Sequence, residues 1–126
     1  MVSWNNLDTL ASFKELANVK PACLTEVMSG DSGADRVKKY SIPMAAGLSY
    51  NYASKQVDED VLSALEKLAD EAQLADKFKA LYNGEVVNTG EKRLVLHHMT
   101  RGQLGDAVEA DGVDKRTFYK TQQERI

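Results

Sequence analysis

The residue types most able to do chemistry gather in one stretch, NTGEKRLVLHHMTR, which runs from residue 88 to residue 101. It contains the adjacent histidines His97 and His98, two arginines and a glutamate. Histidine can bind a metal ion or transfer a proton near neutral pH, and arginine can bind an anion. The stretch could therefore be a metal site, an acid–base site, or a helix that only holds other segments in place.

The spacing of the two histidines argues against a metal site. Adjacent residues on a helix point about 100° apart, whereas two helical ligands of one ion are normally three or four residues apart. Glu91 lies six and seven residues before the histidines, and the chain has no Cys-x-x-Cys pair. We predict no metal and no other cofactor. One of the two histidines is expected to be packed and hydrogen-bonded.

Other catalytic arrangements are also missing from the sequence. There is no Gly-x-Ser-x-Gly elbow and no glycine-rich phosphate loop of the Walker or dinucleotide type. The single cysteine, Cys23, has no base beside it in the sequence and is read as a small apolar residue rather than a thiolate. We predict no catalytic, substrate-binding or metal-binding residue in this chain.

Arg93, His97 and Arg101 follow one another at intervals of four residues. On a helix this spacing makes one polar stripe. The stripe could bind an anion, but Glu91 is close by and the histidine need not be charged. We favour a structural role, in which the three side chains contact backbone carbonyls and carboxylates of neighbouring segments.

The elements expected to position these residues are mostly helical. Residues 58–82 carry apolar side chains at spacings of three and four over about six turns, which predicts one long helix. Asp58 and Asp60 complement its N-terminus, and Asn83-Gly84 ends it. Asn88 and Glu91 have the spacing of a capping box, which predicts a second helix over residues 89–101.

The remaining segments give weaker patterns. The spacing predicts a helix over 4–17, a helical turn over 23–28 and a helix from 116 to the end of the chain. Gly30 and Gly33 predict a loop over 29–36, and three glycines predict a loop or very short strand over 102–115. Alternation of apolar and polar residues predicts a short extended piece over 48–53. The predicted fold is mainly α, an irregular helical domain in which residues 1–126 form a single region.

Composition excludes several classes of function. The chain has 126 residues, of which 43% are hydrophobic and 28% charged, as in a globular protein. Its net charge of −3 gives no reason to expect nucleic acid as a partner. No signal peptide or stretch of membrane-span length is visible, so we expect no membrane association. A single cysteine fits a reducing compartment, and we expect a cytoplasmic protein.

The stretch from residue 84 to residue 101 resembles a motif of the glucose-6-phosphate isomerase family, Gly-Glu-x-Ile-Asn-x-Thr-Glu-x-Arg-Ala-Val-Leu-His-x-x-x-Arg. The spacing is the same throughout, and upstream Arg36, Tyr40 and Ser41 resemble the family's Arg-x-x-x-Phe-Ser. Residues 51–56 resemble its Asp-Tyr-Ser-Lys-Asn segment more loosely, with Asn for Asp and the Ser-Lys pair displaced by one. The motif residues matched here are Gly84, Glu85, Asn88, Glu91, Arg93, His97 and Arg101.

The resemblance implies a parent enzyme that interconverts glucose 6-phosphate and fructose 6-phosphate in glycolysis and gluconeogenesis. A glutamate base of that enzyme moves a proton between C1 and C2, and no metal is required. The resemblance also implies that the phosphate loop and the catalytic residues lie beyond residue 126. We therefore expect this chain to be an inactive N-terminal part of a larger α/β isomerase. Its expected partners are the remaining catalytic domains, and the complete enzyme is expected to be a homodimer. The alternative is a free-standing helical interaction module derived from that enzyme.

Overall fold

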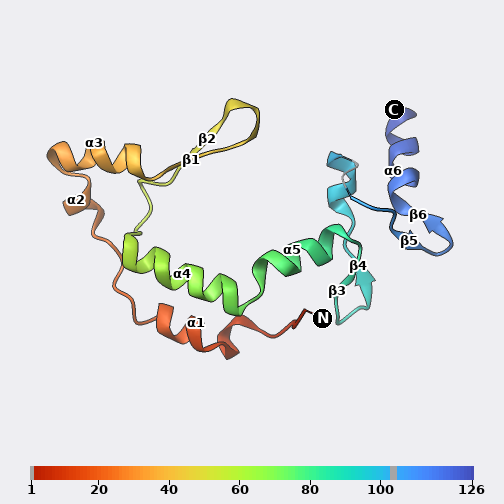
Figure 1. Cartoon of the computed structure of the whole chain (residues 1–126), viewed down its shortest axis with the longest axis horizontal. Helices are drawn as coiled ribbons and strands as arrows, with labels where there is room; N and C mark the ends of the chain where they lie inside the picture. The colour runs from red at the N-terminus through yellow and green to blue at the C-terminus, as the bar shows by residue number, and fades with distance from the viewer. Residues whose placement is uncertain (1, 103–104) are drawn as a thin grey trace. The chain divides into compact units, whose positions relative to one another are not determined.

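A computed structural model describes residues 2–102 and 105–126 of the chain (Figure 1). The chain forms two compact units, Leu10–Leu68 and a second made of Met1–Thr9 with Ala69–Ile126. Helices are the main element of both units, and every described strand pair is a short antiparallel hairpin. The prediction of a mainly α protein is confirmed at this level.

In the unit Leu10–Leu68, short helices lead to a hairpin and then to a longer helix. The elements are α1 (Ala11–Leu16), α2 (Leu24–Val27), α3 (Gly30–Lys39), β1 (Ser41–Pro43), η2 (Ala45–Gly47), β2 (Ser49–Asn51) and the first part of α4 (Glu59–Glu71). Strands β1 and β2 pair with Ile42 opposite Tyr50. The helical turn over 23–28 and the extended piece near 48–53 are confirmed, and β1 is the partner of the extended piece.

The second unit contains η1 (Leu7–Thr9), the end of α4 and the rest of the chain. Its further elements are α5 (Leu74–Tyr82), β3 (Val86–Asn88), β4 (Arg93–Leu94), η3 (His97–Arg101), β5 (Glu109–Ala110), β6 (Val113–Asp114) and α6 (Lys115–Glu124). The predicted C-terminal helix is α6. Residues 102–115 were predicted to be a loop or a very short strand, and they contain two very short strands, β5 and β6, which pair as a hairpin. Positions 103 and 104 of that prediction lie outside the described residues.

The prediction of one helix over 58–82 is wrong, because the chain breaks between α4 and α5. Gln73 has φ 55°, a left-handed conformation that ends α4. Its side-chain oxygen accepts a hydrogen bond from the backbone N–H of Ser3 at 2.9 Å, and its carbonyl accepts the N–H of Lys77 in the first turn of α5. The break contains no glycine or proline, and the apolar spacing continues across it. The sequence pattern therefore gave no sign that the helix ends here.

The loop predicted over 29–36 is also wrong, since these residues begin α3. Asp31 in the first turn and basic residues in the last turn, Lys38 among them, complement the helix dipole. Gly33 does not supply a turn. A Cβ atom at this position would lie 2.4 Å from the carbonyl oxygen of Met28, so glycine permits close packing of the helix on the preceding turn. The helix predicted over 4–17 is reduced to η1 and α1.

The prediction of a helix over 89–101 is wrong as well. Residues 86–94 form the β3–β4 hairpin, and His97–Arg101 is a 3-10 helix. The side-chain oxygen of Asn88 accepts the N–H of Glu91 at 3.2 Å, as the capping-box spacing requires. Lys92 then adopts φ 54°, which turns the chain into β4 instead of continuing a helix.

The hydrophobic core of each unit is small and made largely of alanine. The buried apolar residues are Ala22, Tyr40, Ala53, Val61 and Ala64 in one unit, and Ala72, Ala80, Met99 and Val108 in the other. Met99 is fully buried although it lies in the short η3 helix. Many large apolar side chains are exposed and about as many are half-buried, so polar contacts contribute to holding the loops.

Gly84 ends α5 in the way that the Asn83-Gly84 pair predicts. It has φ 70°, its N–H donates to the carbonyl of Leu81, and the next N–H donates to Ala80, which is the Schellman arrangement. A Cβ atom on Gly84 would lie 2.2 Å from Cγ1 of Val108, which is itself buried. Position 84 therefore needs glycine both for its backbone conformation and for space.

We predict that Gly84→Ala lowers the free energy of unfolding by about 2–4 kcal/mol, because it adds steric overlap to backbone strain. Urea titration followed by circular dichroism measures this change. Gly112→Ala is the matched control in the same unit, since Gly112 has φ 72° and open space around it. Equal losses in the two variants would show that the contact with Val108 contributes nothing.

Candidate functional site

The motif residues are spread along a hairpin and a short helix, and they form no single polar stripe. Glu91 and Arg93 lie at the β3–β4 hairpin, where their side chains make an exposed ion pair with an N···O distance of 3.7 Å. His97 and Arg101 are the two ends of η3, and both are exposed. The structure therefore does not bring Arg93, His97 and Arg101 together on one helix as predicted.

Only part of the predicted contacts of these residues is present. Arg93 does contact a carboxylate, that of Glu91. The backbone carbonyl of His97 accepts the hydroxyl of Thr100 at 2.8 Å. Within residues 2–102 and 105–126, the side chains of His97 and Arg101 make no hydrogen bond or ion pair. The structural role assigned to the full motif set remains a prediction.

The second histidine is packed, as predicted for one of the pair, but it is not hydrogen-bonded within the described residues. His98 stacks on the ring of Tyr82, with ring centroids 4.6 Å apart. Both of its ring nitrogens are buried, and neither has a hydrogen-bond partner there. Arg116 is close enough to act electrostatically on the imidazole. This cluster joins α5, η3 and α6.

Burial and charge together lower the pKa of His98. Desolvation of the ring is the larger cause, and the positive charge of Arg116 adds to it. The nearby carbonyl of Tyr82 opposes the change without reaching hydrogen-bonding geometry. The lowered pKa favours the neutral imidazole, which suits a packed residue.

Arg116 is a residue that the sequence reasoning did not single out. It is 6% exposed, and its guanidinium donates to the backbone carbonyls of Asp106 and Tyr82. One further nitrogen of this group, Nη1, is buried without a partner among the described residues. No local pattern identifies it in the sequence, because the carbonyls it binds lie 10 and 34 residues earlier.

Asp114 caps α6 and keeps Arg116 in place. Its carboxylate accepts the N–H groups of Arg116 and Thr117 at 3.1 and 3.3 Å, and it also accepts the N–H of Val108. The side-chain hydrogen bond from Thr117 is the largest cause that lowers the pKa of Asp114, and the backbone N–H groups add to it. Its carboxylate oxygens are thus already engaged in the turn.

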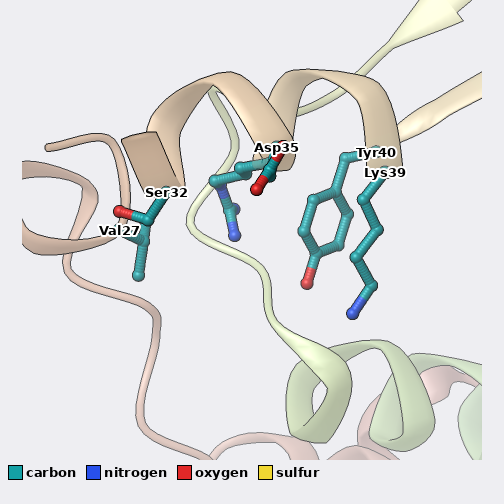
Figure 2. Close-up of a pocket in the computed structure, with 6 residues that line it drawn as sticks. Val27, Ser32, Asp35, Lys39 and Tyr40 are labelled. Carbon is teal, nitrogen blue, oxygen red and sulfur yellow. The ribbon is translucent and has the colours of Figure 1, made fainter. Parts of the chain in front are cut away.

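The other polar cluster lies at the pocket of about 450 Å³ on α3, shown in Figure 2. Its central residue, Arg36, is 7% exposed. The guanidinium donates to the carbonyls of Ala53, Lys55 and Val57 at 2.8, 3.0 and 2.6 Å, and it lies 4.3 Å from the centroid of the Tyr40 ring. Arg36 therefore holds the segment that leads from β2 to α4.

The remaining charged groups at this pocket are also engaged. Figure 2 shows the Lys39 and Tyr40 side chains extending in the same direction from the end of α3. Both contact Glu59, Lys39 at 2.8 Å and the Tyr40 hydroxyl at 3.2 Å. The hydrogen bond with Lys39 lowers the pKa of Glu59 and raises that of Lys39. Asp35 lies 3.7 Å from Lys38.

The contacts of Arg36 and Arg116 support loops. Cys23 is exposed, with its sulfur 3.3 Å from the hydroxyl of Thr25. In the described part of the chain, no group of three or more histidine, cysteine or acidic residues could hold a metal ion. No helix described here is long and apolar enough to cross a membrane.

The chain is similar in sequence to one family of known proteins. The sequence model of the family described as Phosphoglucose isomerase matches residues 51–126. The chain is 41% identical over 99% of its length to the glucose-6-phosphate isomerase of Treponema denticola, and 41% identical over its whole length to that of Borreliella afzelii. The chain belongs to the phosphoglucose isomerase family. The resemblance seen in the motif is thereby confirmed.

The chain spans about a quarter of the length of these curated relatives, 25% of the Treponema denticola isomerase and 23% of the Borreliella afzelii one. A further relative, the glucose-6-phosphate isomerase of Pseudomonas aeruginosa, is 40% identical over 80 residues, or 64% of the chain. Because the Treponema denticola and Borreliella afzelii matches cover 99% and 100% of the chain, the similarity includes the residues around Arg36 and Arg116 as well as the motif.

We predict that Arg36→Ala lowers the free energy of unfolding by about 2–4 kcal/mol, because three carbonyls lose a charged donor. Arg36→Lys should recover little of this loss, since one ammonium cannot reproduce a planar fork with several donors. Urea titration, with hydrogen exchange at residues 53–57, measures both effects. The control is Lys38→Ala on the same helix, whose exposed ion pair should contribute almost nothing.

We also predict that the free energy of unfolding falls as the pH drops below 6.5. The unfolded chain protonates His98 near its ordinary pKa of 6.5, whereas the folded chain resists protonation, so acid favours unfolding. Urea titrations between pH 7.5 and 5 measure the slope. That range lies above the ordinary values of 4.5 for Glu59 and 3.8 for Asp114, whose lowered pKa values remove stability only at lower pH.

His98→Gln should flatten this slope, while the variant His97→Gln at the exposed neighbouring position should keep it. A slope of equal size in His98→Gln and the unaltered chain would contradict a role for His98. The two variants thus distinguish the contribution of the packed His98 to the pH dependence from that of the exposed His97.

Proposed function

We propose that this chain is part of a glucose-6-phosphate isomerase, an enzyme that interconverts glucose 6-phosphate and fructose 6-phosphate. The observation that carries the proposal is the 41% identity over 99% of the chain to the Treponema denticola enzyme of that name. The proposal extends to a place in glycolysis and gluconeogenesis. A cytoplasmic location and a homodimeric complete enzyme remain predictions from the family resemblance.

Within such an enzyme, we assign this chain a supporting role. Its buried polar groups serve backbone segments: Arg36 holds residues 53–57, and Arg116 holds the carbonyls of Tyr82 and Asp106. Its histidines offer neither a metal pair nor a base poised over a pocket. The groups that bind the sugar phosphate and move the proton are therefore expected in the remaining catalytic domains, which are the proposed partner of this chain.

We predict that the 126-residue chain alone has no isomerase activity. We also predict that a chimera is active, in which this chain replaces the aligned quarter of the Treponema denticola isomerase. Formation of glucose 6-phosphate from fructose 6-phosphate, followed through a coupled dehydrogenase, measures both. The control is the Treponema denticola enzyme with the same quarter deleted, which should be inactive because the supporting segments are missing.

Turnover by the chain alone would contradict the supporting role. A chimera that folds with the thermal midpoint of the parent enzyme but has no activity would contradict the proposed function. The Treponema denticola enzyme that lacks this quarter tests whether the quarter is needed. Full activity of that shortened enzyme would contradict a supporting role.

A further inference from the structure

The β1–β2 hairpin has one apolar face and one polar face. Because successive side chains of a strand point to opposite sides, Ile42 and Tyr50 share a face with Met44 and Leu48, which flank the η2 turn. Ser41, Pro43, Ser49 and Asn51 lie on the other face. The apolar face is largely open to solvent, with Met44 55% and Leu48 64% exposed.

The same face continues into a groove within the unit Leu10–Leu68. The groove has a volume of about 300 Å³. Ile42 and Tyr50 line it from the hairpin, and Val57, Leu62 and Leu65 line it from the segment entering α4 and from α4 itself. We call this surface, together with Met44 and Leu48, the hairpin groove. It is largely apolar, and Tyr52 and Lys55 also line it.

The base of the hairpin is held by the rest of the unit, whereas the large side chains at its tip, Met44 and Leu48, are exposed. At the base, the Asn51 side chain donates to the carbonyl of Val37 at 2.7 Å, and the Tyr52 N–H donates to Tyr40 at 2.9 Å. The rings of Tyr50 and Tyr52 stack with centroids 5.9 Å apart. A two-stranded hairpin without a cover is only marginally stable in water. An apolar face of this kind is stabilised when another apolar segment covers it.

We propose that the hairpin groove is a docking surface for an apolar segment from the rest of the isomerase polypeptide. This inference rests on the proposed function. The Treponema denticola relative is similar to this chain along 99% of it, yet about three quarters of that relative's own length lies outside the match. The same hairpin residues are thus aligned within a polypeptide that has ample further chain to cover them.

Covering by the same polypeptide also suits the energetics better than covering by a second copy. A segment on the same chain is present at an effective concentration on the order of millimolar, so it covers the hairpin in every molecule. A second copy would have to associate before each hairpin became stable. The occupant is therefore assigned to the remaining catalytic domains of the enzyme and not to a copy of this chain.

Hydrogen exchange tests the docking directly, by comparing the isolated chain with the chimera described above. The backbone amides of residues 41–51 should exchange about tenfold or more slowly in the chimera, because large apolar side chains must be uncovered before the hairpin opens. Equal exchange rates would overturn the proposal. Protection that appears in the isolated chain as its concentration rises would overturn it in favour of a second copy.

A pair of variants in the chimera separates the two faces of the hairpin. Leu48→Asp puts a charge on the apolar face and should remove the protection at residues 41–51. Ser49→Asp puts the same charge on the polar face one residue away and should retain it. Loss of protection in both variants, or in neither, would show that the apolar face is not what docks.

Activity distinguishes this inference from the function on which it rests. An active chimera with an unprotected hairpin overturns the docking and leaves the isomerase function standing. A protected hairpin in an inactive chimera supports the docking and overturns the function.

Discussion

The guanidinium of Arg36 holds together a unit that has little hydrophobic core of its own. It donates to three backbone carbonyls between Ala53 and Val57, and the ring of Tyr40 lies against it. Hydrogen bonds from a charged donor contribute more than neutral ones, and a buried charge without such partners would be strongly destabilising. The path from the hairpin to α4, and with it the hairpin groove, therefore depends on this side chain. Arg116 acts in the same way in the other unit, where it reaches carbonyls on either side of the β3–β4 hairpin and η3.

Buried arginines are needed here because the apolar residues that remain inside are small. Alanine makes up most of the buried apolar set, and each alanine removes little apolar surface from water. Several of the larger apolar side chains, such as Leu48, Phe78 and Leu74, are exposed. Exposed large apolar side chains on a chain whose loops are held by guanidinium groups are suited to packing against further protein. Within the proposed larger isomerase, these exposed side chains would be buried against other parts of the enzyme.

The sequence predicted helices best where a local feature, such as a glycine at the end or a stretch without helix breakers, determines the backbone conformation. Gly84 ends α5 because its left-handed conformation is easy for glycine, and the C-terminal helix forms where no glycine or proline interrupts it. The errors fall where tertiary contacts override the local pattern. Gln73 breaks α4 from α5 although its type favours helix, and its side chain bonds Ser3, which is 70 residues away. Gly33 marks close packing where glycine commonly marks a turn. Arg116 could not be found from local spacing, because its partners are carbonyls that lie 10 and 34 residues earlier.

The family motif divides into two parts once its contacts are known. Gly84 and Asn88 are explained within the chain, the first by its conformation against Val108 and the second by the turn that it closes with Glu91. These residues fix the backbone between α5 and β4. Other motif residues are not explained in this way: His97 and Arg101 are exposed, and Arg93 makes an exposed ion pair with Glu91, which contributes little to stability. The stability of this chain therefore accounts for Gly84 and Asn88 of the motif, whereas the role of Arg93, His97 and Arg101 stays a prediction.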